Sequence, residues 1–192
     1  MPIPANFNKD GVLDPGTYDA TFTEIRNSIL IKGPAAAPKT WDQSWRFQLL
    51  SMAEVLVKQL WQVGITEIFL DGSFVEDKDH PNDIDGYFDP NLSSLNQDDL
   101  IKFSRLVSSL NNLDSNKVWN WEPRSRVYVP GFSKKQLPMW VFYRTEFYPH
   151  LGQGTGIKDQ YGNDLKFPSA FRQSRNNFIP KGIVRVIKYA GG

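Results

Sequence analysis

The chain has 192 residues, of which 40% are hydrophobic and 14% aromatic, and it contains no cysteine. This length predicts one domain with a substantial core, and the composition excludes a wholly disordered chain. The lack of cysteine excludes disulfides and zinc–thiolate sites. No run of eighteen apolar residues occurs and residues 1–10 do not resemble a signal peptide, so we expect a cytoplasmic protein without a membrane span.

The net charge of +1 conceals two halves of opposite sign. Residues 1–123 hold 10 Lys and Arg against 18 Asp and Glu, whereas residues 124–192 hold 12 against 3. The acidic excess is highest between Glu67 and Asp89, where eight carboxylates accompany a single lysine, Lys78. Such a division suits an acidic metal site opposed by basic groups that hold a metal–triphosphate, or two halves that merely neutralise each other.

The first part of the chain predicts helices before one buried strand. Residues 1–40 are rich in proline and glycine and predict an irregular N-terminal arm, with one short helix that begins at the Thr21-Phe-Thr-Glu24 capping box. A second capping box at Thr40 predicts a long helix, because apolar residues recur with a 3.6-residue period until Gly64. An apolar run at 65–70 predicts the strand, and we place the main domain at residues 41–192.

The rest of the chain predicts one more helix and several strands. We expect a helical turn at 74–77, a strand at 83–89, a helix at 97–110 capped by Ser94, and loops at 151–163 and 167–178. Further strands are expected at 118–121, 126–129, 137–147 and 182–189. This order predicts an α+β (or α/β) fold with a mixed β-sheet flanked by helices.

Two short polar motifs lie between the strand expected at 65–70 and the strand expected at 83–89, one at the end of the first strand and one at the start of the second. Gly72-Ser73 ends the strand at 65–70, and Asp83-Ile84-Asp85 opens the next strand. Alternate strand residues point to the same face, so Asp83 and Asp85 are expected side by side. Two adjacent carboxylates suit a hard cation such as Mg²⁺, which is usually held by one or two carboxylates together with substrate phosphates.

At these motifs the chain resembles the nucleotidyltransferase superfamily typified by DNA polymerase β and the minimal nucleotidyltransferases. The pattern there is a hydrophobic strand, Gly-Ser or Gly-Gly, and then Asp-x-Asp or Asp-x-Glu; here nine residues separate Ser73 from Asp83. The stretch 69–89 also resembles a family of uncharacterised bacterial and phage nucleotidyltransferase-like proteins, as do Leu13–Tyr18 and Lys181–Arg185.

The resemblance implies Mg²⁺-dependent transfer of NMP from an NTP to a hydroxyl on a protein or an RNA. Backbone amides after Gly72 and the Ser73 hydroxyl would hold phosphate oxygens. Asp83 and Asp85 would hold the metal. Glu146, near the end of the strand expected at 137–147, is our choice for the third acid, as metal ligand and proton acceptor, and this choice rests on its position.

The basic second half offers candidate phosphate ligands. Lys181 and Arg185 are our candidates, within a set that also includes Arg172 and Arg175 and is interleaved with aromatic residues. Such a set can bind phosphates and stack bases, or it can be a group of solvated charges around a core strand.

Plainer interpretations remain open for every motif. Gly72-Ser73 can be an ordinary turn and the two aspartates part of a solvated edge strand. Asp71 can cap the turn or add to the acidic field, and His80 and His150 fit loop residues as well as site residues. At the level of function, the alternatives are a catalytically silent nucleotidyltransferase-like binding module of a toxin–antitoxin or phage–host conflict system, or a nucleic-acid-binding protein without chemistry.

Overall fold

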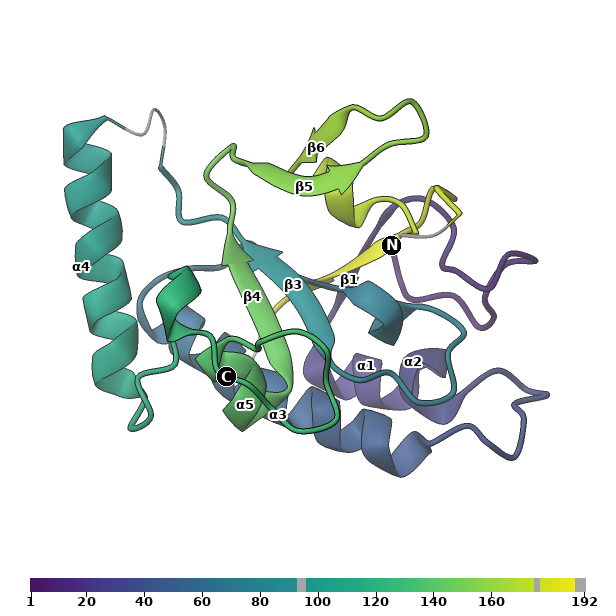
Figure 1. Ribbon diagram of the computed structural model, residues 1–192. Helices are drawn as coiled ribbons and strands as arrows, with labels where there is room; N and C mark the ends of the chain where they lie inside the picture. Colours follow the sequence, from purple (N-terminus) through teal and green to yellow (C-terminus); the bar gives the residue numbers. More distant parts are fainter. Residues whose placement is uncertain (93–95, 175–176, 189–192) are drawn as a thin grey trace.

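The protein has an α+β fold built on a five-stranded mixed sheet, as expected (Figure 1). A computed structural model describes residues 1–92, 96–174 and 177–188. The strand order is β1-β7-β2-β3-β4, with parallel pairs β1–β7 and β3–β4 and antiparallel pairs β7–β2 and β2–β3. The strands are β1 (Thr17–Ala20), β2 (Ile68–Asp71), β3 (Ile84–Phe88), β4 (Thr145–Pro149) and β7 (Ile183–Val186).

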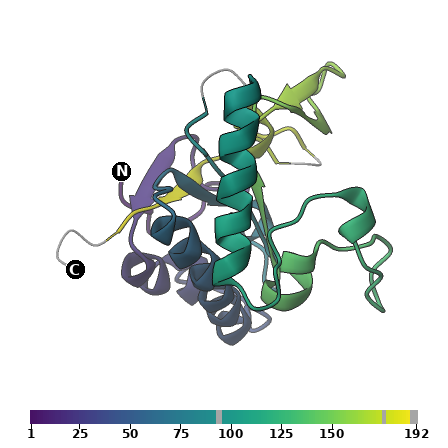
Figure 2. The same cartoon turned by 90° about the vertical axis from the view of Figure 1, so that its left-hand side faces the viewer.

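Three helices lie together on one side of this sheet: α1 (Phe22–Asn27), α2 (Ile29–Lys32) and α3 (Gln43–Gln62) (Figures 1 and 2). The expected capping box at Thr21 is present in full. The long helix α3 is also confirmed, although its N-cap is Asp42 and not Thr40. Apolar residues of α3 and of the sheet belong to one buried cluster, so this side of the sheet is the core.

The segment expected as an irregular arm is part of the domain. It supplies the edge strand β1, and Leu13, Ile25 and Leu30 are fully buried in the main core. The sequence pattern misses β1 because the strand has four residues and follows a turn-rich segment, and its pairing with β7 is between residues far apart in the sequence.

The segment 137–147, expected as one strand, is a helix followed by a strand. Pro138 occupies the first turn of α5 (Pro138–Tyr143), and Arg144 ends the helix in the left-handed conformation with φ of 46°. Only then does β4 begin, at Thr145. The strand prediction was wrong here because six apolar or aromatic residues fit a short buried helix as well as a strand.

The structure differs from the sequence-based expectations in further places between residues 96 and 171. Neither 118–121 nor 126–129 is a strand; Trp119 is buried in the core, and Val127 forms an isolated bridge with Gln136. The glycine-rich loop contains a hairpin of β5 (Gly154–Lys158) and β6 (Asp164–Lys166). Helix α4 (Gln97–Leu113) is capped by Asn96, and the expected cap Ser94 lies outside the described residues. The 3₁₀ turns are η1 (Gly72–Val75), η2 (Pro123–Ser125) and η3 (Ser169–Phe171).

The face of the sheet opposite the helices carries the candidate site. On neighbouring strands, Phe69 pairs with Tyr87 and Tyr87 with Tyr148, and this aromatic row contacts Phe167 and Phe171 beneath the β5–β6 hairpin. Two residues further along these strands, the same face of the sheet carries acidic residues in place of aromatic ones. Within the described part of the chain, no helix combines the length and apolar character that a bilayer crossing requires.

Candidate functional site

Three carboxylates occupy adjacent positions across β2, β3 and β4. Asp71 is the register partner of Asp85, and Asp85 is the register partner of Glu146. Asp85 and Glu146 therefore stand directly opposite each other on parallel strands. Neighbouring strands lie about 4.8 Å apart, so this register concentrates negative charge in one row of the sheet.

The Gly72-Ser73 turn lies against the middle of this row. It forms the 3₁₀ turn η1 directly after β2, and Gly72 has φ of +72°. A Cβ atom on Gly72 would be 3.0 Å from Cβ and Cγ of Asp85 and still closer to its Oδ2. Glycine is thus required here for two reasons: the left-handed backbone and the close approach of Asp85.

A cleft of about 950 Å³ opens over the acids and the turn. Its lining includes six of the seven residues to which the sequence analysis assigns a catalytic, metal-binding or phosphate-binding role, and its other walls come from the 126–136 segment, the β5–β6 hairpin and the region around η3. The six predicted residues that line it are Gly72, Ser73, Asp83, Asp85, Glu146 and Lys181. Residues up to 109 positions apart in sequence are therefore brought to one hollow.

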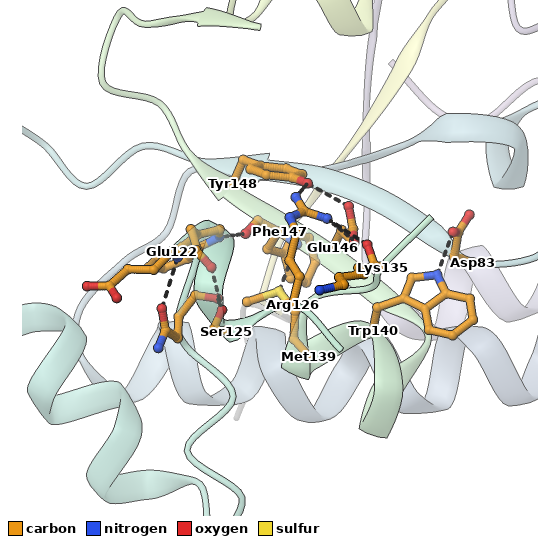
Figure 3. A network of polar contacts seen from close by, with 12 residues as sticks. Asp83, Glu122, Ser125, Arg126, Lys135, Met139, Trp140, Glu146, Phe147 and Tyr148 are labelled. Carbon is orange, nitrogen blue, oxygen red and sulfur yellow. Dashed lines mark hydrogen bonds and ion pairs between the residues drawn. The ribbon is translucent and has the colours of Figure 1, made fainter. Parts of the chain in front are cut away.

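Asp83 and Glu146 are engaged with protein donors in the structure (Figure 3). Asp83, immediately before β3, accepts a 2.7 Å hydrogen bond from the indole N–H of Trp140. Glu146 accepts a 2.6 Å hydrogen bond from the Tyr148 hydroxyl, and Arg126 Nη1 lies 3.8 Å from Glu146 Oε1. Burial and the Glu146 charge raise the pKa of the Tyr148 phenol, so this group remains a donor at neutral pH.

The donor chemistry suits a hard cation that is completed by phosphate oxygens. Asp83, Asp85 and Glu146 supply only carboxylate oxygens and open to the same cleft. However, no group of three or more acids or histidines within the described ranges is gathered closely enough to hold a metal by itself. Within those ranges, the acids therefore do not form a complete metal-binding cage by themselves.

Lys181 is a buried member of the site. Its side chain is 3% exposed, and Nζ lies 2.6 Å from Glu76 Oε1, 3.1 Å from Asp71 Oδ1 and 3.2 Å from the carbonyl oxygen of Gly72. Burial would lower the pKa of Lys181, but the two carboxylates outweigh it and hold that pKa above its ordinary value. Lys181 therefore fastens β2 and the turn to the segment before β7.

Burial acts on the pKa of Asp71 in the opposite direction from its effect on a lysine. Burial raises the pKa of this carboxyl to about 7, although the nearby Lys181 acts against the shift. Lys181 thus lies between a fully buried carboxyl group with a raised pKa and a second carboxylate, Glu76, that is partly exposed.

Arg185 does not reach the cleft, and this part of the prediction needs correction. It is opposite Phe69 and Asp19 in the sheet, and its guanidinium makes a two-pronged ion pair with Asp19, at 2.7 and 3.0 Å, and a further pair with Glu67 at 3.2 Å. Its partners are fixed by β-sheet register, which the sequence does not reveal.

The other basic and imidazole candidates also lie elsewhere. Arg172 donates to the Gly16 carbonyl and the Thr17 hydroxyl, both at 2.8 Å, and Arg175 lies outside the described residues. His80 stacks on Trp45 and is 3.0 Å from Asp42, while His150 meets the edge of Tyr87. The structure describes four of these candidates, and none of the four lines the cleft: Arg172, His80, His150 and Arg185.

Sequence reasoning missed three residues that shape the site: Arg126, Trp140 and Tyr148. Tyr148 could have been found, because it is two positions after Glu146 on a strand and so shares its face. Trp140 is 57 residues from Asp83 and Arg126 precedes Glu146 by twenty, and neither carries a local signal in the sequence.

Fold and site together define an α+β protein in which a mixed sheet presents an acidic row and a glycine turn to a polar cleft. The chain matches the family described as a family of unknown function (DUF6932) over residues 5–187, and it therefore belongs to that family. No curated protein and no solved structure is matched.

Proposed function

We propose that this protein is a Mg²⁺-dependent nucleotidyltransferase that moves NMP from an NTP to a hydroxyl on a protein or an RNA, in the cytoplasm. The observation that carries the proposal is the convergence of the Gly72-Ser73 turn, Asp83, Asp85 and Glu146 on one cleft, with Asp85 and Glu146 paired in register. The cleft, at about 950 Å³, has room for a nucleoside triphosphate.

The residues divide the chemistry among them. The amides of the η1 turn and the Ser73 hydroxyl hold phosphate oxygens, and Asp83, Asp85 and Glu146 would hold Mg²⁺, which neutralises the triphosphate and the pyrophosphate leaving group. The acceptor hydroxyl forms a bond to the α-phosphorus while the bond from that phosphorus to pyrophosphate breaks. Glu146 would accept the proton that the hydroxyl releases.

The proposal is tested by labelling from α-³²P-NTP in the presence of Mg²⁺ and a cell extract that supplies the acceptor. Asp83→Ala and Asp85→Ala should abolish the labelling and leave the circular dichroism spectrum unchanged. Asp89→Ala is the matched control, because Asp89 directly follows the same strand but does not line the cleft. Equal labelling by Asp85→Ala and the parent protein would refute the assigned roles.

A second candidate is a catalytically silent binding module, acting on a protein partner in a toxin–antitoxin or phage–host conflict system. One observation favours it: Asp83 and Glu146 are engaged by Trp140 and by Tyr148 with Arg126, an arrangement that also serves a purely structural network. Thermal unfolding separates the two candidates. An NTP at about 100 times its Kd stabilises a binding protein by about 2.7 kcal/mol, or roughly 5–10 °C for a chain of this size. A silent module shows no shift with NTP and Mg²⁺.

A further inference from the structure

Arg126 sits at the wall of the cleft, beside the acidic row. It follows the 3₁₀ turn η2, and the backbone of the next residue, Val127, is bridged to Gln136 by two hydrogen bonds of 2.9 and 2.8 Å. Figure 3 shows its guanidinium between Tyr148 and Glu146, with Lys135 next to it. Among the described residues that line the cleft, Arg126 is the one arginine.

The guanidinium of Arg126 is held only loosely. It donates to the Tyr148 hydroxyl and to the Lys135 carbonyl at 3.3 Å each, and its closest carboxylate oxygen, on Glu146, is 3.8 Å away. Charge-assisted hydrogen bonds of arginine are usually about 2.7–2.9 Å long. Arg185, by contrast, grips Asp19 with two bonds of 2.7 and 3.0 Å. With 32% of its side chain exposed, Arg126 retains donors for a stronger partner.

The other cations of the cleft are less suited to this role. Lys181 is almost fully buried between Asp71 and Glu76. Lys78, Lys134 and Lys135 are exposed at the rim, and an ammonium group acts as a point charge without the planar fork that matches phosphate oxygens.

We propose that Arg126 is a phosphate-binding residue whose guanidinium leaves Glu146 when a nucleotide polyphosphate enters the cleft. This inference rests on the proposed function. The Glu146 carboxylate cannot coordinate a divalent cation and remain ion-paired with Arg126 through the same oxygens, because the two positive groups compete for it. An incoming polyphosphate supplies Arg126 with a bidentate partner at the moment when the cation requires Glu146. Arg126 thereby couples nucleotide binding to metal binding.

The test is isothermal titration with two probes, ATP with Mg²⁺ and Mn²⁺ alone. Arg126→Gln should weaken the binding of ATP with Mg²⁺ by about tenfold to a hundredfold, as expected for the loss of a charge-assisted pair of hydrogen bonds. The same variant should tighten the binding of Mn²⁺ alone by up to about fivefold, because Glu146 loses its partly exposed ion-pair partner. Arg126→Lys keeps the charge without the fork and should show an intermediate affinity for ATP.

Arg124→Gln is the matched control, since its side chain is 86% exposed, pairs with Glu122 and does not line the cleft. It should leave both affinities unchanged. A residue that merely supports the 126–136 segment would not move the two affinities in opposite directions. Equal affinities for ATP in the parent protein and Arg126→Gln, or a loss of both ATP and Mn²⁺ binding in Arg126→Gln, would overturn the role of Arg126 alone. Failure of the parent protein to bind any of the four common NTPs with Mg²⁺ would overturn the proposed function, and this inference with it.

Discussion

Gly72→Ala should damage the site far more than it damages the fold. The new methyl group would stand 3.0 Å from Cβ and Cγ of Asp85 and closer still to its Oδ2, on a backbone with φ of +72°. The left-handed conformation costs a non-glycine residue about 1–2 kcal/mol. The carboxylate of Asp85 can rotate away from the methyl group, so most of the steric conflict is relieved by displacing the group that the site needs.

Gly64→Ala provides the matched control for this substitution. Gly64 follows helix α3 with φ of +86°, and a Cβ atom there meets nothing within 4 Å. Both variants should therefore lose about 1–2 kcal/mol from backbone strain, which lowers Tm by roughly 2–8 °C for a chain of this size. Only Gly72→Ala should also lose the binding of ATP with Mg²⁺.

The assays are urea denaturation for the free energy of unfolding and isothermal titration for nucleotide binding. The expected result is a similar loss of stability in both variants and at least a tenfold loss of affinity in Gly72→Ala alone, equivalent to about 1.4 kcal/mol. If Gly72→Ala binds ATP with Mg²⁺ as tightly as Gly64→Ala does, the turn is not a phosphate-binding element and the reasoning fails.

Two further predictions concern the buried charges behind the turn. Lys181→Met should lower the free energy of unfolding at pH 8 by about 3 kcal/mol or more, because it leaves Asp71 buried without its cation. Arg185→Met removes a partly exposed ion pair and should cost only about 1 kcal/mol. Equal losses for the two variants in urea denaturation would contradict this prediction. Burial raises the pKa of Asp71 from 3.8 to about 7, so the folded protein retains a proton that the unfolded chain releases between these values. The stability of the parent protein relative to Asp71→Asn should therefore fall as pH rises from about 5 to 8, by at most about 1.4 kcal/mol per pH unit, and a difference that is constant or grows with pH would show that Asp71 is ionised throughout.

The sequence predicts the centre of this molecule better than its periphery. Helix α3 and strands β2 and β3 carry strong local patterns, a 3.6-residue apolar period and short runs bounded by turn residues, and all three are present. Asp83, Asp85 and Gly72 could be placed together because all three lie in or next to the short connection between two consecutive strands. Their proximity follows from local structure.

Long-range pairing accounts for what the sequence does not reveal. Strand β1 is recognisable only through β7, which follows it by more than 160 residues, and Arg185 finds Asp19 through the same pairing. The network of Arg126, Tyr148 and Glu146 likewise depends on how the 126–136 segment folds back towards β4. Residue periodicity contains no information about such contacts. Glu146 belongs to the part of 137–147 that is a strand, and its register opposite Asp85 is a further long-range pairing that the sequence does not predict.

The central claim, that the acids of the cleft close around a divalent cation together with a nucleotide, is tested most directly by anomalous diffraction. Crystals grown with Mn²⁺ and a non-hydrolysable NTP should show a manganese peak bounded by Asp83, Asp85 and Glu146, with the phosphates against Gly72 and Ser73 and the Arg126 guanidinium on a phosphate oxygen. Crystals with the nucleotide bound elsewhere, or with no manganese between these acids while Trp140 and Arg126 keep their present partners, would contradict the account.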